Sequence, residues 1–215
     1  MPFDHNDHYH RLLLRHVPYG CRTALDVGCG TGRFARRLAQ RGIEVDAVDR
    51  SAQVIEAAVS AAPDDEAGNR PRFRLADVTS AQLPQGRYDF VSCLASVHHM
   101  PFRPAVEALR GALAPGGTLV VLGCYPERSP VDYAWSGAAI PVNAVARAAV
   151  AVRERCAGGR SVLPRLSPGV PPRVRAPVAR PEVPLKQIRQ QAAELLPGST
   201  VRRLLFWRYL LVYRR

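Results

Sequence analysis

The chain has 215 residues, of which 47% are hydrophobic, so it is long enough to bury one sizeable core and short for two. No apolar run approaches the ~20 residues that cross a bilayer, and the first ten residues do not follow the pattern of a signal peptide. We therefore expect a cytoplasmic protein without a membrane segment. The five cysteines are widely spaced and form no C-x-x-C pair, which indicates neither a disulfide framework nor a zinc site.

The formal net charge of +12 lies entirely in the last third of the chain. Residues 1–146 contain 15 Arg and 15 acidic residues, whereas residues 147–215 contain 14 Arg and Lys186 against three Glu. A basic segment of this kind suits an anionic partner. The near-absence of Lys, together with abundant Ala and Pro, is equally consistent with coding bias.

The N-terminal residues 1–20 carry apolar residues at Leu12, Leu13 and Val17, which predict one face of a helix. Its histidines leave three interpretations open: a metal site, a solvated polar face, or a lid over a bound ligand. Because the histidines lack a matching set of carboxylates or cysteines, we expect no metal there.

Strand-like and helix-like segments then alternate, which predicts an α/β fold with a mostly parallel sheet. Apolar residues at helical spacing predict three helices, which begin near Phe34, Ser51 and Val106. The predicted strands are Ala24–Val27, Ile43–Val48, Phe73–Ala76, Tyr88–Ser96 and the apolar part of "PGGTLVVLGCY".

The pattern changes after Tyr125. Apolar spacing predicts a helix over Pro141–Cys156, and seven prolines in Ser161–Pro184 predict an extended connector. A helix over Leu185–Leu196 follows. Two strand-like stretches, Leu204–Phe206 and Tyr209–Tyr213, are too close in sequence for a crossover and must pair antiparallel.

The stretch "ALDVGCGTGRF" contains the pattern D-x-G-x-G-x-G, formed by Asp26, Gly28, Gly30 and Gly32. It is not a phosphate-binding P-loop, because no Lys follows the glycines. It also lacks the third glycine of the dinucleotide fingerprint, a position that Arg33 occupies. A carboxylate before a glycine turn suits a positively charged ligand group and disfavours phosphate.

This pattern resembles the first motif of the class I S-adenosylmethionine-dependent methyltransferases, and the resemblance extends over residues 20–124. Asp49 stands where the family has the acid that binds the ribose hydroxyls, and Asp77 where it has the acid that receives the adenine amino group. The segments "YDFVSCLASVHHM" and "LRGALAPGGTLVVLG" match the motifs of the fourth and fifth strands.

The resemblance implies a Rossmann-like, doubly wound α/β fold with a seven-stranded, mostly parallel sheet and an antiparallel last strand. Residues 1–215 then form one domain. It consists of an N-terminal helical lid (1–20), a cofactor-binding core (21–124), an insertion that serves as a substrate lid with a Pro-rich connector (125–184), and a C-terminal helix and β-hairpin (185–215). The implied S-adenosylmethionine-binding residues are Tyr9, Asp26, Gly28, Cys29, Gly30, Gly32, Asp49, Arg50, Ala76, Asp77, Val78, Leu94 and Ala95.

Catalysis and substrate binding have fewer signals. His98 and His99 follow the fourth strand and are candidate bases, although a purely structural role stays open. If the strand end is extended, their side chains point to opposite sides and at most one reaches the acceptor. Tyr133 and Trp135 line a substrate pocket or anchor the insertion to the core. Glu127 and Asp132 are isolated, so we expect no metal.

The predicted activity is methyl transfer to a small molecule, favouring an oxygen of a metabolite. The alternative is a methyltransferase acting on RNA or protein, or a cofactor-binding module that uses the basic last third. The N-P-P-Y type motif of base-modifying enzymes is absent, since Ala95 to His98 read A-S-V-H. This favours a small-molecule substrate over nucleic acid, and the oligomeric state stays open.

Overall fold

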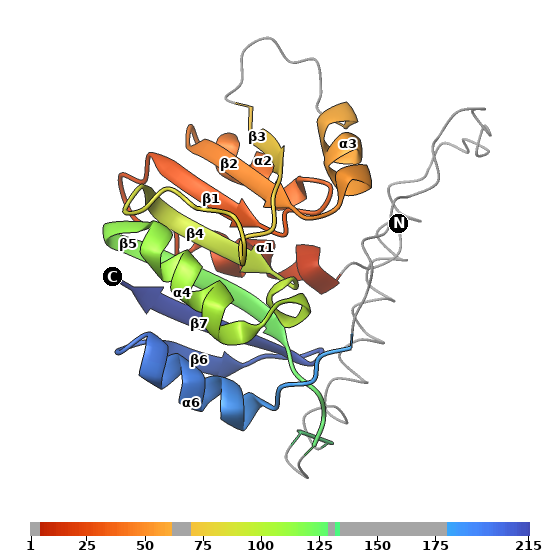
Figure 1. Ribbon diagram of the computed structural model, residues 1–215, viewed down its shortest axis with the longest axis vertical. Helices are drawn as coiled ribbons and strands as arrows, with labels where there is room; N and C mark the ends of the chain where they lie inside the picture. Colours follow the sequence, from red (N-terminus) through yellow and green to blue (C-terminus); the bar gives the residue numbers. More distant parts are fainter. Residues whose placement is uncertain (1–4, 62–69, 129–131, 134–179) are drawn as a thin grey trace, which may run out of the picture.

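The computed structural model describes residues 5–61, 70–128, 132–133 and 180–215. Seven strands form one sheet in the order β3-β2-β1-β4-β5-β7-β6 (Figure 1). The strands are β1 (Thr23–Val27), β2 (Glu44–Asp49), β3 (Arg72–Leu75), β4 (Tyr88–Leu94), β5 (Leu113–Cys124), β6 (Thr200–Arg203) and β7 (Arg208–Arg214). The helices are α1 (His5–Leu14), α2 (Arg33–Ala39), α3 (Ala52–Ser60), α4 (Phe102–Ala112) and α6 (Leu185–Leu195), with a short 3-10 helix η1 (Val97–His99).

The strand directions confirm the predicted doubly wound, mostly parallel sheet. β1 pairs in parallel with β2 and β4, β2 with β3, and β4 with β5. β7 alone runs in the direction opposite to the other six strands, since it pairs antiparallel with both β5 and β6. Consecutive parallel strands leave their carboxyl ends at one edge, which is where open α/β sheets bind ligands.

Helices cover both faces of the sheet. α4 and α6 lie on the near face in Figure 1 and bury Leu109 and Ile188 in one apolar cluster. On the other face, α1 and α2 bury Leu13 and Leu38 in a second cluster. β5 serves both clusters, because alternate side chains of a strand point to opposite faces. Leu119 and Val121 belong to the first cluster, and Val120 and Leu122 to the second.

The predicted hairpin exists, but its first strand was misplaced. β6 is Thr200–Arg203, whereas Leu204–Phe206 lies in the connection to β7. Phe206 and Trp207 have positive φ angles of 60° and 57°, which a strand does not accommodate. The apolar side chain of Phe206 is buried, so its hydrophobicity reflects packing rather than strand structure.

The fourth strand is shorter than predicted. β4 ends at Leu94, Ala95 has a φ of 51°, and the chain then turns into η1. The expectation that His98 and His99 point to opposite sides is therefore wrong, because it assumed extended backbone. The predicted helix over 141–156 lies outside the described residues, as does most of the predicted connector over 161–184. In the part of the chain that the structure describes, no helix is long and apolar enough to cross a membrane.

Candidate functional site

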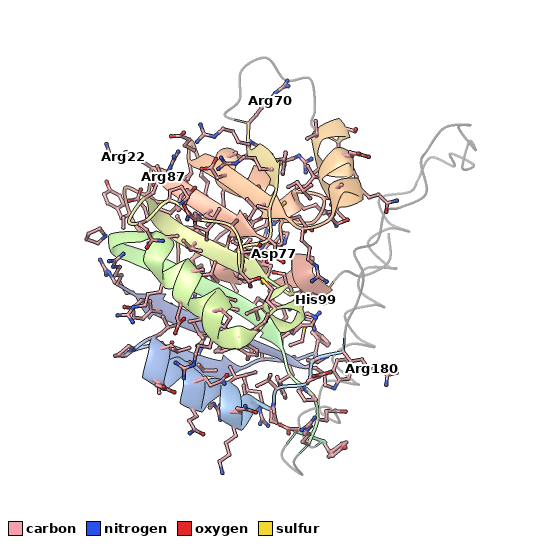
Figure 2. The ribbon with its side chains drawn as sticks, in the orientation of Figure 1. Arg22, Arg70, Asp77, Arg87, His99 and Arg180 are labelled. Atoms are coloured by element: carbon pink, nitrogen blue, oxygen red, sulfur yellow. The ribbon has the colours of Figure 1, made fainter. Side chains whose placement is uncertain are left out.

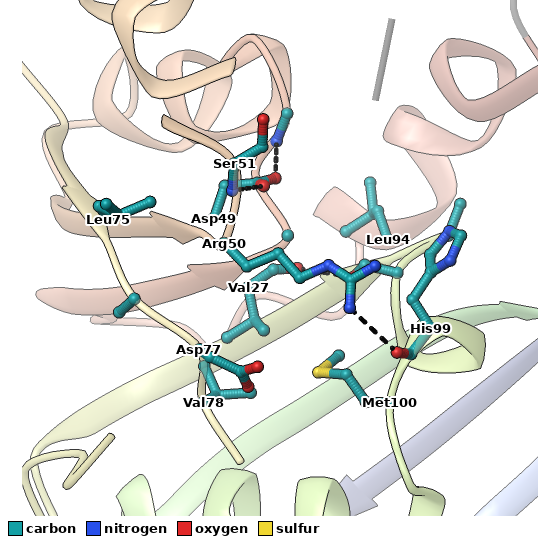
Figure 3. Close-up of a pocket in the computed structure, with 15 residues that line it drawn as sticks. Val27, Asp49, Arg50, Ser51, Leu75, Asp77, Val78, Leu94, His99 and Met100 are labelled. Atoms are coloured by element: carbon teal, nitrogen blue, oxygen red, sulfur yellow. Dashed lines mark hydrogen bonds between the residues drawn. The ribbon is translucent and has the colours of Figure 1, made fainter. Parts of the chain in front are cut away.

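A cavity of about 620 Å³ opens at the carboxyl ends of β1, β2, β3 and β4 (Figure 3). The predicted cofactor residues that line it come from all four strand ends: Gly28 and Gly30, Asp49 and Arg50, Ala76 to Val78, and Leu94 and Ala95. Asp49 and Asp77 lie on one side and His99 and Met100 on the other, with Arg50 extending between them (Figure 3). The topology therefore brings together residues that are far apart in the sequence.

The turn after β1 requires its glycines. The amides of Gly28 and Cys29 both donate to the Val48 carbonyl, at 2.8 and 3.0 Å, which joins the turn to β2. Gly28 has a φ of +65°, and a Cβ at this position would overlap the side chain of Ser96. Gly30 has a φ of +55° and open space where its Cβ would be. A ligand can therefore approach the backbone closely at Gly30.

Asp49 is held in place at the end of β2. Its Oδ2 accepts a hydrogen bond from the Gly30 amide at 3.1 Å, and its Oδ1 accepts one from the Ser51 amide at 3.0 Å. Each carboxylate oxygen has further acceptor capacity. The carboxylate is thus oriented before any ligand arrives and still has room to accept two more donors.

Asp77 follows β3 on the same side of the cavity. Its Oδ1 accepts hydrogen bonds from the Thr79 amide at 2.9 Å and the Thr79 hydroxyl at 2.7 Å. These bonds, with a smaller contribution from the charge of Arg50, lower the pKa of Asp77 below its usual value. The residue is therefore an ionised acceptor at neutral pH.

Asp26 lies beneath the turn and does not line the cavity. Its side chain is 1% exposed. One oxygen accepts a hydrogen bond from the Ser92 hydroxyl at 2.7 Å. The other, Oδ2, is buried and has no hydrogen-bond partner of standard geometry among the described residues, and the Ala35 amide makes only a small contribution to lowering the pKa. Burial raises the pKa of Asp26 to about 7, with a smaller contribution from the charge of Asp49.

Replacing Asp26 by Asn should make the cofactor-free protein more stable at alkaline pH. The folded pKa of about 7 lies above the unfolded value of 3.8, so the folded state binds more protons between these values. Stability from this group is consequently lost as the pH rises from about 4 to 7. The melting-temperature advantage of Asp26→Asn over the wild type should therefore grow from pH 4.5 to pH 8, as measured by circular dichroism. An equal difference at both pH values would contradict this.

Asp46 provides the matched control, since it is also 1% exposed. Burial alone would raise its pKa. Hydrogen bonds from Tyr88 at 2.7 Å and Arg72 at 2.9 Å, with the charge of Arg74, outweigh burial and lower the pKa. Asp46 therefore contributes stability above its unfolded pKa, which is lost as the pH falls. Asp46→Asn should destabilise the protein at pH 8, opposite in sign to Asp26→Asn.

The rings of His98 and His99 pack against each other in η1, with centroids 4.0 Å apart and an interplanar angle of 38°. Burial lowers the pKa of His98 to about 4, helped by the charges of His99 and Arg208. Burial also lowers the pKa of His99, as does Arg50, while Asp49 opposes the shift. Both imidazoles are therefore neutral at pH 7, and the Nδ1 of each is buried with no hydrogen-bond partner among the described residues.

A second cavity of about 420 Å³ adjoins the first. Arg50, His99 and Met100 line both cavities, whereas His98 lines only the second. The remaining wall of the second cavity comes mainly from α6 and the segment before it, the end of β5, the start of β7 and the start of α4. The site thus has two compartments that meet at His99.

Several predicted site residues are not among those that line either cavity. Tyr9 is buried and its hydroxyl donates to the Leu205 carbonyl at 2.9 Å. Cys29 and Gly32 lie in the turn, and a Cβ on Gly32 would overlap the Phe73 ring. Tyr133 is 61% exposed. Trp135 lies outside the described residues, and the roles assigned to all of these residues remain predictions.

The first cavity also contains residues that were not predicted from the sequence. These are Val27, Ser51, Leu75, Ser96 and Met100. Each lies within a few positions of a predicted residue at a strand end, and that proximity is the only signal in the sequence. Among the described residues, no group of three or more His, Cys, Asp or Glu side chains is placed to hold a metal ion.

The first cavity fits a nucleoside with a cationic tail. Asp49 offers two acceptors for a diol, Asp77 offers one for an amino group, and Leu75, Val78 and Met100 offer apolar surface. Two carboxylates against one guanidinium line the cavity, which favours a positively charged ligand group. The open backbone at Gly30 lets that group approach the turn closely. S-adenosylmethionine combines these features.

Comparisons with known proteins agree with this geometry. Residues 25–121 match the family model described as a methyltransferase domain. The chain is 34% identical to an uncharacterized methyltransferase of Mycobacterium tuberculosis over 215 residues, 99% of this chain and 97% of that protein. It is 35% identical to a ubiquinone biosynthesis O-methyltransferase of Idiomarina loihiensis over 100 residues, 46% of this chain and 40% of that protein.

A solved structure shares the fold over nearly the whole chain. The magnesium protoporphyrin IX methyltransferase of Synechocystis, crystallised with bound S-adenosylhomocysteine, has a TM-score of 0.59 and 20% sequence identity. The match covers 98% of this chain and 83% of that one. With the strand order and the matched motifs, these similarities establish that the chain belongs to the class I S-adenosylmethionine-dependent methyltransferases.

Proposed function

We propose that the protein transfers the methyl group of S-adenosylmethionine to a hydroxyl oxygen of a small molecule bound in the second cavity. The observation that carries this proposal is the position of His99, which lines both the cofactor cavity and the adjoining 420 Å³ cavity. That volume is within the usual range of small-molecule sites. The relatives named as O-methyltransferases support oxygen as the acceptor atom.

The chain's own residues have limited chemistry to supply. The sulfonium of the cofactor provides an activated methyl group, so the protein mainly has to position the acceptor, which can contribute ~7–11 kcal/mol. A hydroxyl acceptor must also lose its proton. His99 is neutral at pH 7 and can take that proton on its imidazole, whereas His98 packs against it from within the second cavity.

A transfer assay tests this function. The protein is incubated with methyl-labelled S-adenosylmethionine and one class of acceptor at a time. The classes are a panel of small phenols and alcohols, total RNA, and a protein extract. We expect an O-methyl ether in a small-molecule fraction, identified by mass spectrometry. Label found only in RNA or protein, or only on nitrogen or carbon, would refute the proposal.

Cofactor selectivity should be visible without an acceptor. S-adenosylhomocysteine at ~100 times its dissociation constant should stabilise the fold by ~2.7 kcal/mol, a shift of several degrees in melting temperature. ATP and NAD should produce no such shift, because the carboxylates Asp49 and Asp77 disfavour phosphates beside them. A thermal shift with NAD but not with S-adenosylhomocysteine would contradict the assignment of the cavity.

A further inference from the structure

The second cavity has an unequal distribution of charge. Arg50 and Arg180 line it, and Glu182 is the one carboxylate among its described lining residues. Figure 2 shows Arg180 on the same side of the molecule as His99, where the strands end. Neither arginine forms an ion pair within 4 Å with a described carboxylate, and Arg50 donates a long hydrogen bond of 3.5 Å to the His99 carbonyl.

The other polar groups of this cavity are uncharged at neutral pH. Burial lowers the pKa of both histidines, and the charges of Arg208 and Arg50 lower it further. Burial likewise raises the pKa of Tyr209 and of Cys124. With two guanidinium groups and one carboxylate, the described lining has a net charge of +1.

The rest of the wall is apolar. Phe102, Val183 and Ile188 line the cavity, and Ile188 is buried in the core cluster beneath it. A ligand that fits this wall needs an apolar body with one negatively charged end. A single charge matches a carboxylate better than a phosphate monoester, which carries up to two at pH 7.

We infer that the methyl acceptor carries a carboxylate, which Arg180 and Arg50 bind while an apolar body packs against Phe102, Val183 and Ile188. This inference rests on the proposed function, since it concerns the acceptor of the same reaction. Arg180 contacts the acceptor but not the cofactor, because it does not line the cofactor cavity. Arg50 lines both cavities and so contributes to the binding of both molecules.

Matched pairs of acid and amide test the inference. The probes are 4-hydroxybenzoate, 4-hydroxyphenylacetate and 4-hydroxycinnamate with their amides, titrated by calorimetry into protein saturated with S-adenosylhomocysteine. At least one acid should bind tenfold or more tightly than its amide. Arg180→Gln should reduce this preference below threefold without changing the affinity for S-adenosylhomocysteine.

Lys186→Gln is the control, because Lys186 is an exposed cation on nearby α6 that does not line the cavity; its acid preference should match the wild type. The inference is overturned if no acid binds more tightly than its amide, including the case in which none binds, or if Arg180→Gln keeps the preference. If phenyl phosphate binds more tightly than every acid, the assignment of a carboxylate to the acceptor is also overturned. These titrations need no turnover, so they are independent of the transfer assay. If the protein prefers acids but methylates only amines, the proposed O-methylation is refuted and the carboxylate site is not.

Discussion

Asp49→Ala should bind S-adenosylhomocysteine about a hundredfold more weakly than the wild type. Two hydrogen bonds from ribose hydroxyls to a carboxylate are worth ~1.5 kcal/mol each at the low end, and ~1.4 kcal/mol is tenfold in affinity. The loss should be large because Asp49 is oriented in advance by the Gly30 and Ser51 amides. Isothermal calorimetry measures it directly.

Asp89 is the matched control for that experiment. Its Oδ2 accepts hydrogen bonds from the amides of Arg22 and Thr23 at 2.9 and 3.0 Å, so Asp89→Ala also removes a carboxylate that holds backbone. Asp89 pairs with the start of β1, at the opposite edge of the sheet. The Asp89→Ala variant should have a lower melting temperature than the wild type but the same affinity for S-adenosylhomocysteine. Equal losses of affinity in both variants would show that Asp49 acts only on the fold.

His99→Ala should lower kcat by ~10² to 10⁴ while leaving the affinity for S-adenosylhomocysteine within a fewfold of the wild type. The reason is that His99 lines both cavities and is the base in the mechanism we propose. His98→Ala should have a smaller effect on kcat, because His98 lines only the second cavity. Single-turnover rates at saturating cofactor separate this chemical effect from binding.

The pH dependence distinguishes a base from a packing role. Because burial and Arg50 lower the pKa of His99, the wild-type rate should fall on the acid side only below pH 6.5. Arg50→Gln removes one of these causes and should move the acid limb to higher pH. If neither histidine variant loses tenfold in rate, or if the acid limb is the same in His99→Gln as in the wild type, His99 is not the base.

The sequence was most informative where a function depends on local spacing. Gly28, Gly30, Asp49 and Asp77 lie at or just after the ends of predicted strands, and parallel strands end at one edge, so a ligand site was expected there. The resemblance to the methyltransferase family then indicated which ligand it binds. Asp26 illustrates a limit of this reasoning. Its position in the motif was clear, but its burial away from the cavity depends on packing beneath the turn.

The features that the sequence did not reveal depend on distant contacts. Arg180 reaches the second cavity only because α6 packs beside α4, far from any motif. The contact between the rings of His98 and His99 follows the turn at Ala95, whose positive φ is unusual for alanine. The sequence predicts a strand at Phe206 because the residue is apolar, whereas in the structure it is buried in a turn.

The pairing of β5 with β7 has a consequence for how the chain is synthesised. Cys124 and Arg208, neighbours across these strands, are 84 positions apart, and at ~5–20 residues per second the ribosome takes several seconds to make that stretch. During this interval β5 is an open edge carrying Leu119, Val120 and Val121, a surface prone to aggregation. Substitutions that weaken the pairing of β7 should therefore lower the yield of folded protein in cells, even where the melting temperature of the purified protein falls only slightly.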